Sequence, residues 1–448
     1  MKERYERPVI QLQTEGQRSH FAYDGSSRAM TAIEGVPVSK LVDQFGSPLF
    51  VFSERTLRRQ YKDLYRAFSV RYPAVQLAWS YKTNYLRTLC TILHSEGAWA
   101  EVVSEFEYEM ACQIGISGPK IVFNGPFKSV SGLERAVKDG ALINLDNTDE
   151  LYAMFEIAEK FGKSVDVGIR INLDAGLETN WSRFGFNLEN GEARKTVRMA
   201  VESGKLNITG LHCHVGTFIL DTEIYRRQAK KLVSFAHDIQ KDFGVALKYI
   251  DVGGGFASTN TLHYQYLTGS QISPSFDQYA EAICNELLTL ESPSGTPPLL
   301  ILETGRAVVD ESGFLIASVV NTKRLTTGIR AITLDAGVNA LITAWWYKHE
   351  IIPAQDFAGV PEATVIYGPL CMMIDVIREY LMLPPLVKGD RVVIKPVGAY
   401  NCAQWMQWIQ ARPAVALIEE SGDVRLIRNR ETVEDLYRQD KIPGNTDF

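Results

Sequence analysis

Short apolar runs alternate with helical patterns between about residues 75 and 305, and this alternation limits the fold more than any other feature of the chain. The segments between the runs carry apolar side chains at every third or fourth position, as amphipathic helices do. The eight expected strands are 76–81, 99–103, 120–123, 141–145, 165–171, 208–214, 247–252 and 299–303. Strands and helices that alternate in this way are typical of parallel βαβ units.

Eight such units in roughly 250 residues predict a (β/α)8 barrel, an α/β fold of the TIM type. A doubly wound open sheet is the competing arrangement. No G-x-G-x-x-G motif opens a helix after the first strand, which weakens that alternative. A further apolar run at 49–52 precedes the eight, and Ser53 is expected to cap the helix that follows it. We therefore assign residues 46–306 to the barrel domain.

The pattern changes after residue 306, where strand-like runs are separated by turns with few helical patterns between them. The runs are 314–320, 330–334, 363–367, 391–397 and 414–419. They predict an all-β domain, a β-sandwich or barrel, made of residues 307–448. We expect the N-terminal segment, residues 1–45, to complete this domain.

Composition limits the class of protein. The chain has 448 residues and a net charge of −6, which argues against a general affinity for nucleic acid or an anionic membrane. No apolar stretch could cross a bilayer, and the charged N-terminus shows no signal peptide. The six cysteines lack metal-like spacing and suit free thiols in a reducing compartment. A cytoplasmic enzyme or binding protein is expected.

A barrel of this type carries its functional groups at the carboxyl ends of the strands. Lys82 ends the first run, where burial would disfavour the charged form of its amine and make it a nucleophile toward a carbonyl. By itself it could equally be a surface lysine. The later strand ends carry Glu101 with Ser104, Asn124, Asp146 with Asn147, Arg170 with Asn172, His214, Gly253-Gly254-Gly255, and Glu303 with Arg306. So many polar groups in succession favour a functional site.

Three consecutive glycines follow the seventh run. Their backbone N–H groups could form a nest for an anion, because no side chain blocks close approach. Gly305 and Arg306 follow the eighth run, and barrels of this type often bind phosphate after strands seven and eight. A flexible turn is the alternative for the glycines alone. The nearby arginine favours phosphate binding.

Two histidines, His212 and His214, alternate along the sixth run and could share a metal ion. No third ligand with clear spacing is present, so a histidine packed against an aromatic cofactor agrees better with the other residues. Glu303 is expected to be partly buried and to need a cationic partner. A lysine, a phosphate cradle, an acid and a stacking histidine together describe a site for pyridoxal 5'-phosphate.

Several motifs in combination resemble the fold-type III pyridoxal-phosphate decarboxylases, the group of diaminopimelate, ornithine and arginine decarboxylases. The resemblance runs from about residue 38 to 418 and implies a barrel of the alanine racemase type. The motifs are Tyr81-Lys82-Thr83-Asn84, Glu101-Val102-Val103-Ser104, His214-Val215-Gly216, Asp251-Val252-Gly253-Gly254-Gly255-Phe256, Glu303-Thr304-Gly305-Arg306, Gly368-Pro369-Leu370-Cys371 and Gly398-Ala399-Tyr400.

The resemblance implies a role for each matching residue. Lys82 would carry the cofactor as a Schiff base, His214 would stack on its ring, and Glu303 would contact the pyridine nitrogen. The remaining cofactor-binding residues would be Glu101, Gly254, Gly255, Gly305, Arg306 and Tyr400. The second domain would contribute Tyr400 and Cys371, the latter as the general acid entering the site of the neighbouring subunit. A homodimer with two shared sites is therefore implied.

Two other functions are compatible with the same fold. Alanine racemases place an arginine at the pyridine nitrogen, so Glu303 favours decarboxylation over a racemase or epimerase. A catalytically inactive partner protein that keeps the dimer surface is the second alternative. Retention of the lysine, the histidine, the acid, the arginine and the cysteine argues against it.

Departures from the family concern the substrate. Met372 stands where the relatives carry an acid for the distal ammonium, and Asp375 could take part of that role. Thr343 stands where diaminopimelate decarboxylases carry an arginine. With Tyr400, these are the expected substrate-binding residues, and neighbouring tryptophans make the pocket more apolar. We expect an amino-acid substrate other than meso-diaminopimelate. The alternative is an aminoacyl group on an acyl-carrier protein.

Overall fold

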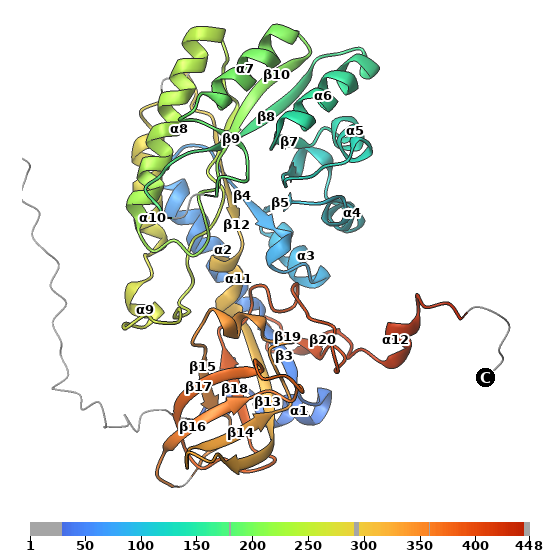
Figure 1. The fold of residues 1–448 in the computed structure, drawn as a ribbon, viewed down its shortest axis with the longest axis vertical. Helices are drawn as coiled ribbons and strands as arrows, with labels where there is room; N and C mark the ends of the chain where they lie inside the picture. The colour runs from blue at the N-terminus through green and yellow to red at the C-terminus, as the bar shows by residue number, and fades with distance from the viewer. Residues whose placement is uncertain (1–28, 179–180, 291–294, 358, 443–448) are drawn as a thin grey trace, which may run out of the picture.

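Two domains follow one another along the long axis of the molecule in the computed structural model (Figure 1). The structure describes residues 29–178, 181–290, 295–357 and 359–442. The helix-wrapped strands of the first domain lie at one end of Figure 1, and the β-rich second domain lies at the other end. The polar groups expected at the strand ends belong to the first domain.

Eight parallel strands of the first domain form a closed barrel. They are β4 (Val75–Ser80), β5 (Trp99–Val102), β6 (Ile121–Phe123), β7 (Leu142–Leu145), β8 (Val165–Asn172), β10 (Leu206–His212), β11 (Tyr249–Asp251) and β12 (Leu299–Thr304). Each strand pairs with the next, and β12 pairs with β4 to close the ring. A two-residue strand, β9 (Phe186–Asn187), pairs with the end of β8. The barrel prediction is confirmed, and the open sheet is excluded.

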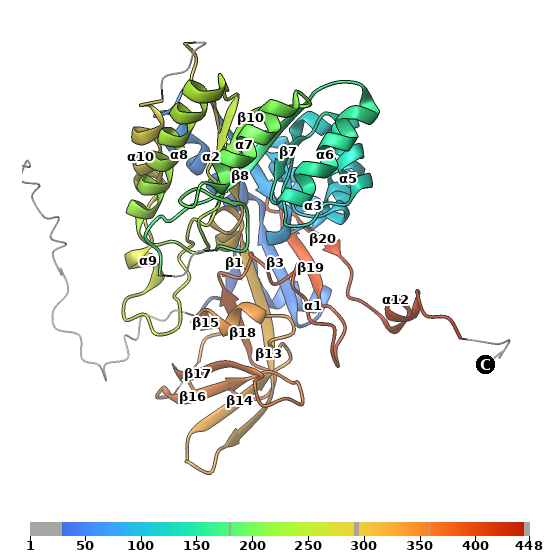
Figure 2. The ribbon, with the colours of Figure 1, turned by 45° about the horizontal axis from the view of Figure 1, so that its top comes forward.

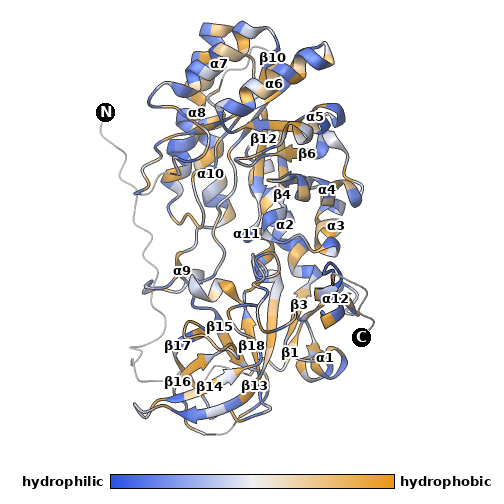
Figure 3. Ribbon diagram, turned by 45° about the vertical axis from the view of Figure 1, so that its right-hand side comes forward, coloured by the Kyte–Doolittle hydropathy of each residue, from blue (hydrophilic) through white to orange (hydrophobic). Residues whose placement is uncertain are grey.

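Helices surround the barrel (Figure 2). They are α2 (Glu54–Ser69), α3 (Arg87–Ser95), α4 (Glu105–Gln113), α5 (Val130–Asp139), α6 (Thr148–Phe161), α7 (Glu192–Ser203), α8 (Thr222–Phe243) and α10 (Phe276–Leu287). In Figure 3 hydrophilic residues lie beside hydrophobic ones along these helices, as expected for helices with one face on the barrel. Ser104 and Asn147, two of the expected strand-end groups, accept hydrogen bonds from the first turns of α4 and α6 and so act as helix caps.

The second domain is built around one long strand, β13 (Gly313–Arg324). Its first half pairs with β18 (Arg391–Lys395), and its second half pairs with β14 (Arg330–Leu334), so that one strand connects two parts of a sheet. The other strands are β15 (Glu350–Pro353), β16 (Glu362–Tyr367), β17 (Val376–Leu383), β19 (Ala414–Ile418) and β20 (Val424–Arg428). β15, β17 and β20 were not predicted, because each is short or carries charged residues among its apolar ones.

The boundary between the domains differs from the predicted one. The strand β3 (Leu49–Ser53), expected inside the barrel domain, pairs with β13 and β19 of the second domain. All five of its residues are buried, so its sequence is indistinguishable from that of a barrel strand. The barrel domain therefore begins at Glu54. Ser53 accepts a hydrogen bond from the Thr56 N–H at the start of α2, which confirms it as the cap.

The N-terminal segment packs on the second domain, as expected, over the part that the structure describes. The strands β1 (Ala32–Ile33) and β2 (Val36–Pro37) and the helix α1 (Val38–Phe45) share an apolar cluster with β3, β13, β18 and β19. Residues 1–28 of the predicted segment lie outside the described residues. The remaining α-helices of the described residues are short: α9 (Gly269–Ile272), α11 (Arg306–Val309) and α12 (Val433–Tyr437).

Among the described residues, no helix is both long enough and apolar enough to cross a membrane.

The cap at Ser53 predicts a measurable contribution to stability. The Ser53 hydroxyl also donates to Glu34, so that one side chain connects the N-terminal segment with the start of α2. We expect Ser53→Ala to lower the midpoint of urea unfolding by an amount equivalent to about 1 kcal/mol. The control Ser234→Ala removes an exposed hydroxyl from α8 and should leave the midpoint unchanged. Equal midpoints for the two variants would contradict this role of Ser53.

Candidate active site

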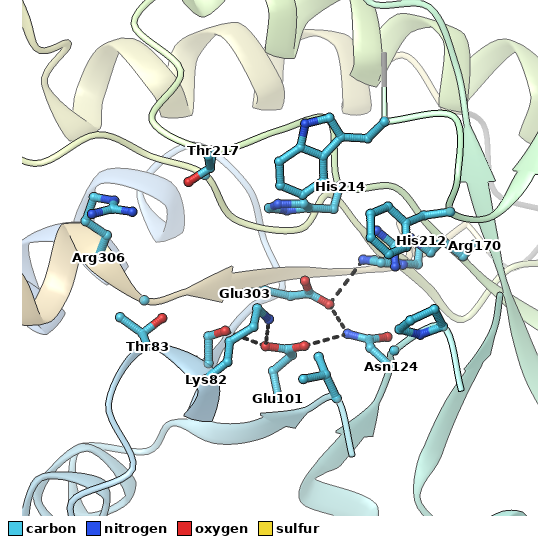
Figure 4. Close-up of a pocket in the computed structure, with 18 of the residues that line it drawn as sticks. Lys82, Thr83, Glu101, Asn124, Arg170, His212, His214, Thr217, Glu303 and Arg306 are labelled. Atoms are coloured by element: carbon cyan, nitrogen blue, oxygen red, sulfur yellow. Dashed lines mark hydrogen bonds and ion pairs between the residues drawn. The ribbon is translucent and has the colours of Figure 1, made fainter. Parts of the chain in front are cut away.

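A cavity of about 380 Å³ lies at the carboxyl ends of the barrel strands. It brings together residues from the ends of seven barrel strands, from the loop between β8 and β9, and from the second domain (Figure 4). The predicted site residues that line it are Lys82, Glu101, His214, Gly255, Glu303, Gly305, Arg306 and Tyr400. Asn124 and Arg170, expected at strand ends without an assigned role, also line it.

Lys82 follows β4 in a single 3-10 turn, Tyr81–Thr83. Its Nζ lies 2.5 Å from Glu101 Oε2, and the Ser80 hydroxyl donates to the same oxygen. The side chain is 38 % exposed because its amine faces the cavity. Burial alone would lower the pKa of Lys82, but Glu101 and Glu303 together raise it above its usual value. Burial therefore disfavours the charged amine, as expected, but the nearby carboxylates outweigh burial and favour the charged form.

Glu303, at the end of β12, is buried and accepts a hydrogen bond from the Asn124 side chain. His212 Nε2 lies 3.2 Å from its Oε1. Burial would raise the pKa of Glu303, but His212 and Lys82 hold it well below its usual range. Burial and the charge of Glu303 raise the pKa of Asp251 well above normal. The pKa values of these two neighbouring carboxyls are thus shifted in opposite directions, and Glu303 is the one whose ionised form is favoured.

His212 and His214 play different parts, although both lie at the end of β10. His212 faces Glu303 and Asp251, and these three are the one group of described residues whose ligand atoms are close enough to surround a metal ion. His214 lines the cavity instead, so the two histidines do not form the metal pair that the sequence left open. Figure 4 shows His214 across the cavity from Glu303.

The ring of His214 is held in one orientation. Its Nδ1 accepts a hydrogen bond from the Gly254 N–H at 3.1 Å, and the Trp181 ring packs edge-on against it at 5.3 Å. Burial lowers the pKa of His214 to about 3, so the imidazole is neutral. Gly253 has a positive φ of 70°, and a Cβ there would come within 2.8 Å of the His214 Cβ. Glycine is therefore required at this turn.

Backbone and a cation line the opposite end of the cavity. A Cβ on Gly255 would meet the Gly216 carbonyl oxygen at 2.1 Å, and one on Gly305 would meet Thr83 Oγ1 at 2.2 Å. The Nη1 of Arg306 is buried without a hydrogen-bond partner among the described residues. A buried guanidinium nitrogen without a hydrogen-bond partner, beside backbone that carries no side chains, is a site for an anion.

Tyr400 joins the second domain to this end of the cavity. Its backbone N–H donates to the Thr83 carbonyl at 2.7 Å, one residue after Lys82. Its ring lies 4.7 Å from the guanidinium carbon of Arg306. Tyr400 adopts a φ of +67°, which is uncommon for a residue with a side chain. The cavity is thus formed by both domains.

Comparisons with known proteins identify the family. The model of the pyridoxal-dependent decarboxylase family, for its pyridoxal-binding domain, matches residues 54–310. The chain belongs to this family of pyridoxal-dependent carboxy-lyases. The match begins at Glu54, the residue at which strand pairing also places the start of the barrel domain.

Relatives with known names match nearly the whole chain. The diaminopimelate decarboxylase of Methanocaldococcus jannaschii is 30 % identical over 92 % of this chain and 95 % of its own. The Bacillus subtilis enzyme of the same name is 27 % identical, with 92 % and 95 % covered. A crystal structure of the M. jannaschii decarboxylase with L-lysine superposes with a TM-score of 0.83 at 29 % identity, covering 92 % of this chain and 96 % of that one.

A Vibrio vulnificus lysine/ornithine decarboxylase, complexed with putrescine, shares the fold. Its TM-score is 0.73 at 22 % identity, with 86 % of this chain and 98 % of that chain covered. The relatives thus include a diaminopimelate decarboxylase at 30 % identity. Their names do not support the exclusion of meso-diaminopimelate that the sequence suggested.

Five of the predicted site residues do not line this chain's cavity. Asp375 is buried, and its two carboxylate oxygens accept hydrogen bonds from the N–H groups of Val338 and Leu370. It fixes the loop that carries Cys371, and we assign it this structural role in place of the expected substrate contact. Thr343 is also buried, with its hydroxyl between His349 and Asn401. It too is a structural residue in this chain.

Cys371 and Met372 lie on the same loop between β16 and β17. Cys371 is exposed, and neither residue lines the cavity of its own chain. Gly254 lies behind the cavity wall, where a Cβ would meet the Glu303 carbonyl oxygen at 2.1 Å. Its contribution is the N–H that orients His214.

Sequence reasoning missed several cavity residues that come from loops. Trp181, Arg183 and Phe184 lie between β8 and β9, and Thr217 follows β10. None follows a strand directly or forms a motif, so no local signal distinguishes them. Arg170 was found as a strand-end residue, and its guanidinium lies 3.0 Å from Asp146 and stacks over Phe184.

The Lys82–Glu101 pair predicts a shift in pH dependence. Glu101→Gln keeps the shape of the side chain but removes the charge that raises the pKa of Lys82, so that pKa should fall. More of the amine is then neutral at pH 8 and able to attack an aldehyde. We expect the rate at which the apoprotein takes up pyridoxal phosphate, followed by absorbance, to rise at a lower pH than in the wild type.

Glu109→Gln is the matched control, because Glu109 pairs with Arg135 on the surface of the barrel domain. Its pH profile should coincide with that of the wild type. A Glu101→Gln profile that also coincides would contradict the assigned effect of Glu101 on Lys82.

Proposed function

We propose that this protein removes the α-carboxyl group of an amino acid to give the amine and CO2, with pyridoxal 5'-phosphate as cofactor. The observation that carries the proposal is the placement of Lys82, ionised Glu303 and unpartnered Arg306 around one cavity. Family membership supports the same chemistry. The amine, the buried carboxylate and the guanidinium with its unpartnered Nη1 correspond to the three parts of the cofactor that a protein must hold.

The residues present fit this cofactor. Lys82 would hold its aldehyde carbon, and Arg306 with the backbone at Gly255 and Gly305 would bind its phosphate. Neutral His214 would offer a flat apolar face to the ring. When bound, pyridoxal phosphate supplies a pyridinium ring that accepts the electron pair left by a departing carboxylate.

Glu303 favours decarboxylation over racemisation. His212 and Lys82 keep it ionised, and a buried carboxylate would hold a proton on an adjacent ring nitrogen. His212 and Asn124 orient this carboxylate from behind. Neutral His214 could not compete for that proton, because its own pKa is lowered to about 3.

The proton that replaces the carboxylate needs a donor, and we assign this role to Cys371 of a second copy of the chain. Among the described residues, no cysteine lines the cavity. Cys371 is exposed on a loop whose base is fixed by Asp375, and the adjoining Met373 is 94 % exposed. An exposed thiol and an apolar loop tip suit insertion into another subunit. The active form would be a homodimer with shared sites.

The substrate is an α-amino acid. An aminoacyl group on a carrier protein is a second candidate, favoured by a chamber of about 550 Å³ that adjoins the cofactor cavity. A panel of free and carrier-linked amino acids scored for CO2 release separates the two.

Shared sites predict complementation between inactive variants. Lys82→Ala and Cys371→Ala should each reduce CO2 release by at least about a hundredfold, because one loses the cofactor attachment and the other the proton donor. After the two variants are mixed and allowed to exchange subunits, half of the dimers would carry one intact site. We expect activity to return to about one quarter of the wild-type value.

Two further observations make this test decisive. The Lys82→Ala protein should lack the cofactor absorbance near ~420 nm that borohydride abolishes, whereas Cys371→Ala should retain it. Mixed variants that stay inactive would contradict shared sites. Full activity of Lys82→Ala alone would contradict the assignment of the lysine.

A further inference from the structure

A second chamber, of about 550 Å³, opens beside the cofactor cavity. The two spaces share four lining residues, Trp181, Thr217, Arg306 and Tyr400. A molecule whose reacting end lies at Lys82 can therefore extend into this chamber. Its volume is larger than that of the cofactor cavity itself, so it offers far more room than a small amino-acid side chain needs.

The walls of the chamber are mainly aromatic. Beyond the shared residues, they include Phe218, Leu262, Trp346 and Tyr347. No described lining residue is acidic. A distal ammonium group, such as that of a diamino acid, would enter this space without a carboxylate partner. Met372 stands at the position where the relatives carry an acid for the distal ammonium. The carboxylate of Asp375 already accepts hydrogen bonds from backbone N–H groups.

The aromatic rings do not offer free faces for a cation. The Arg306 guanidinium already lies over three of them, at 5.5 Å from Phe218, 5.2 Å from Tyr347 and 4.7 Å from Tyr400. A second cation in this chamber would be repelled by the positive charge of Arg306 and would also pay the free-energy penalty of desolvation.

The chamber is equally unsuited to a distal carboxylate. Arg306 is the one arginine or lysine among its described lining residues, and the proposed function uses it for the cofactor phosphate. The ring of His263 is already occupied at Nε2, which lies 2.9 Å from the Ala344 carbonyl oxygen. Thr343, at the position where relatives carry an arginine, is buried and hydrogen-bonded.

We infer that the substrate is an α-amino acid whose distal part is bulky and uncharged, and that this part binds in the aromatic chamber. The inference rests on the proposed function, since it takes the reacting end to lie at Lys82. Gln404, exposed at the chamber wall, provides an amide that can both donate to and accept from a neutral polar group. Aromatic or amide-linked distal groups therefore suit the lining best.

Matched probes test the inference on the holoenzyme. L-Lysine and Nε-benzoyl-L-lysine share the same reacting end, but one carries a distal ammonium and the other a bulky neutral amide. We expect kcat/KM for CO2 release to be at least about tenfold higher for the benzoyl compound than for L-lysine or meso-diaminopimelate. An equal or higher value for either charged compound would overturn the inference.

Binding is measured separately from turnover, so that failure of the proposed function can be recognised. The change in cofactor absorbance on adding each probe gives its Kd whether or not CO2 is released. Tighter binding of the benzoyl compound without CO2 release would support the chamber and contradict decarboxylation. CO2 release with no preference for the neutral probe would support decarboxylation and overturn the chamber, as would failure of every probe to bind.

Two adjacent tryptophans offer a matched pair of variants. Trp346 lines the chamber, whereas Trp345 has nearly the same exposure, 40 % against 39 %, and lines none of the described cavities. Trp346→Ala should raise KM for the benzoyl compound about tenfold with little change in kcat, and Trp345→Ala should change neither. Leu262→Glu would add an acid to the chamber and should shift preference toward L-lysine. Equal effects of the two tryptophan variants, or no shift with Leu262→Glu, would contradict the assignment.

Discussion

A buried cluster of charges holds this site together. Lys82 contacts Glu101, Asn124 bridges Glu101 and Glu303, and His212 lies against Glu303. Each member comes from a different strand end, so the cluster exists only when the barrel closes. Burying any one of these charges alone would cost several kcal/mol. Together they keep Glu303 ionised, whereas the pKa of the neighbouring Asp251 is raised. Asp251 accepts the Gly253 N–H and so supports the glycine turn.

A few hydrogen bonds between the two domains hold residues of the site in position. The Tyr400 N–H holds the Thr83 carbonyl next to Lys82, and the Asn84 side chain donates to the Gly398 carbonyl. The strand β3 leads from the second domain into the first barrel helix. The same domain also presents Cys371 on a loop away from its own cavity. One domain thus completes the cavity of its own chain and, in the proposed dimer, the reacting centre of another.

Sequence reasoning located the barrel and most of its polar strand ends, because hydrophobic periodicity and strand termination are local properties. It failed for features that depend on contacts between residues far apart in the sequence. β3 is as apolar as a barrel strand, and its partners 260 or more positions away determine its domain. For Lys82, the sequence predicted the effect of burial on the pKa but not the opposing effect of Glu101 and Glu303, which lie near the amine only in the closed barrel. Trp181 and Thr217 reach the cavity from loops, for which the chain carries no periodic signal. Asp375 was predicted to contact the substrate, but its carboxylate oxygens accept hydrogen bonds from the backbone N–H groups of Val338 and Leu370.

The central claim is that the charge cluster keeps Glu303 as a carboxylate that holds a proton on the cofactor ring. Nuclear magnetic resonance of the holoprotein with 15N-labelled pyridoxal phosphate measures that protonation directly. The account predicts a protonated ring nitrogen throughout pH 6 to 9 in the wild type, identified by its chemical shift, and an unprotonated one in Glu303→Gln. A nitrogen that is unprotonated in the wild type at pH 7, or unchanged by Glu303→Gln, would contradict it.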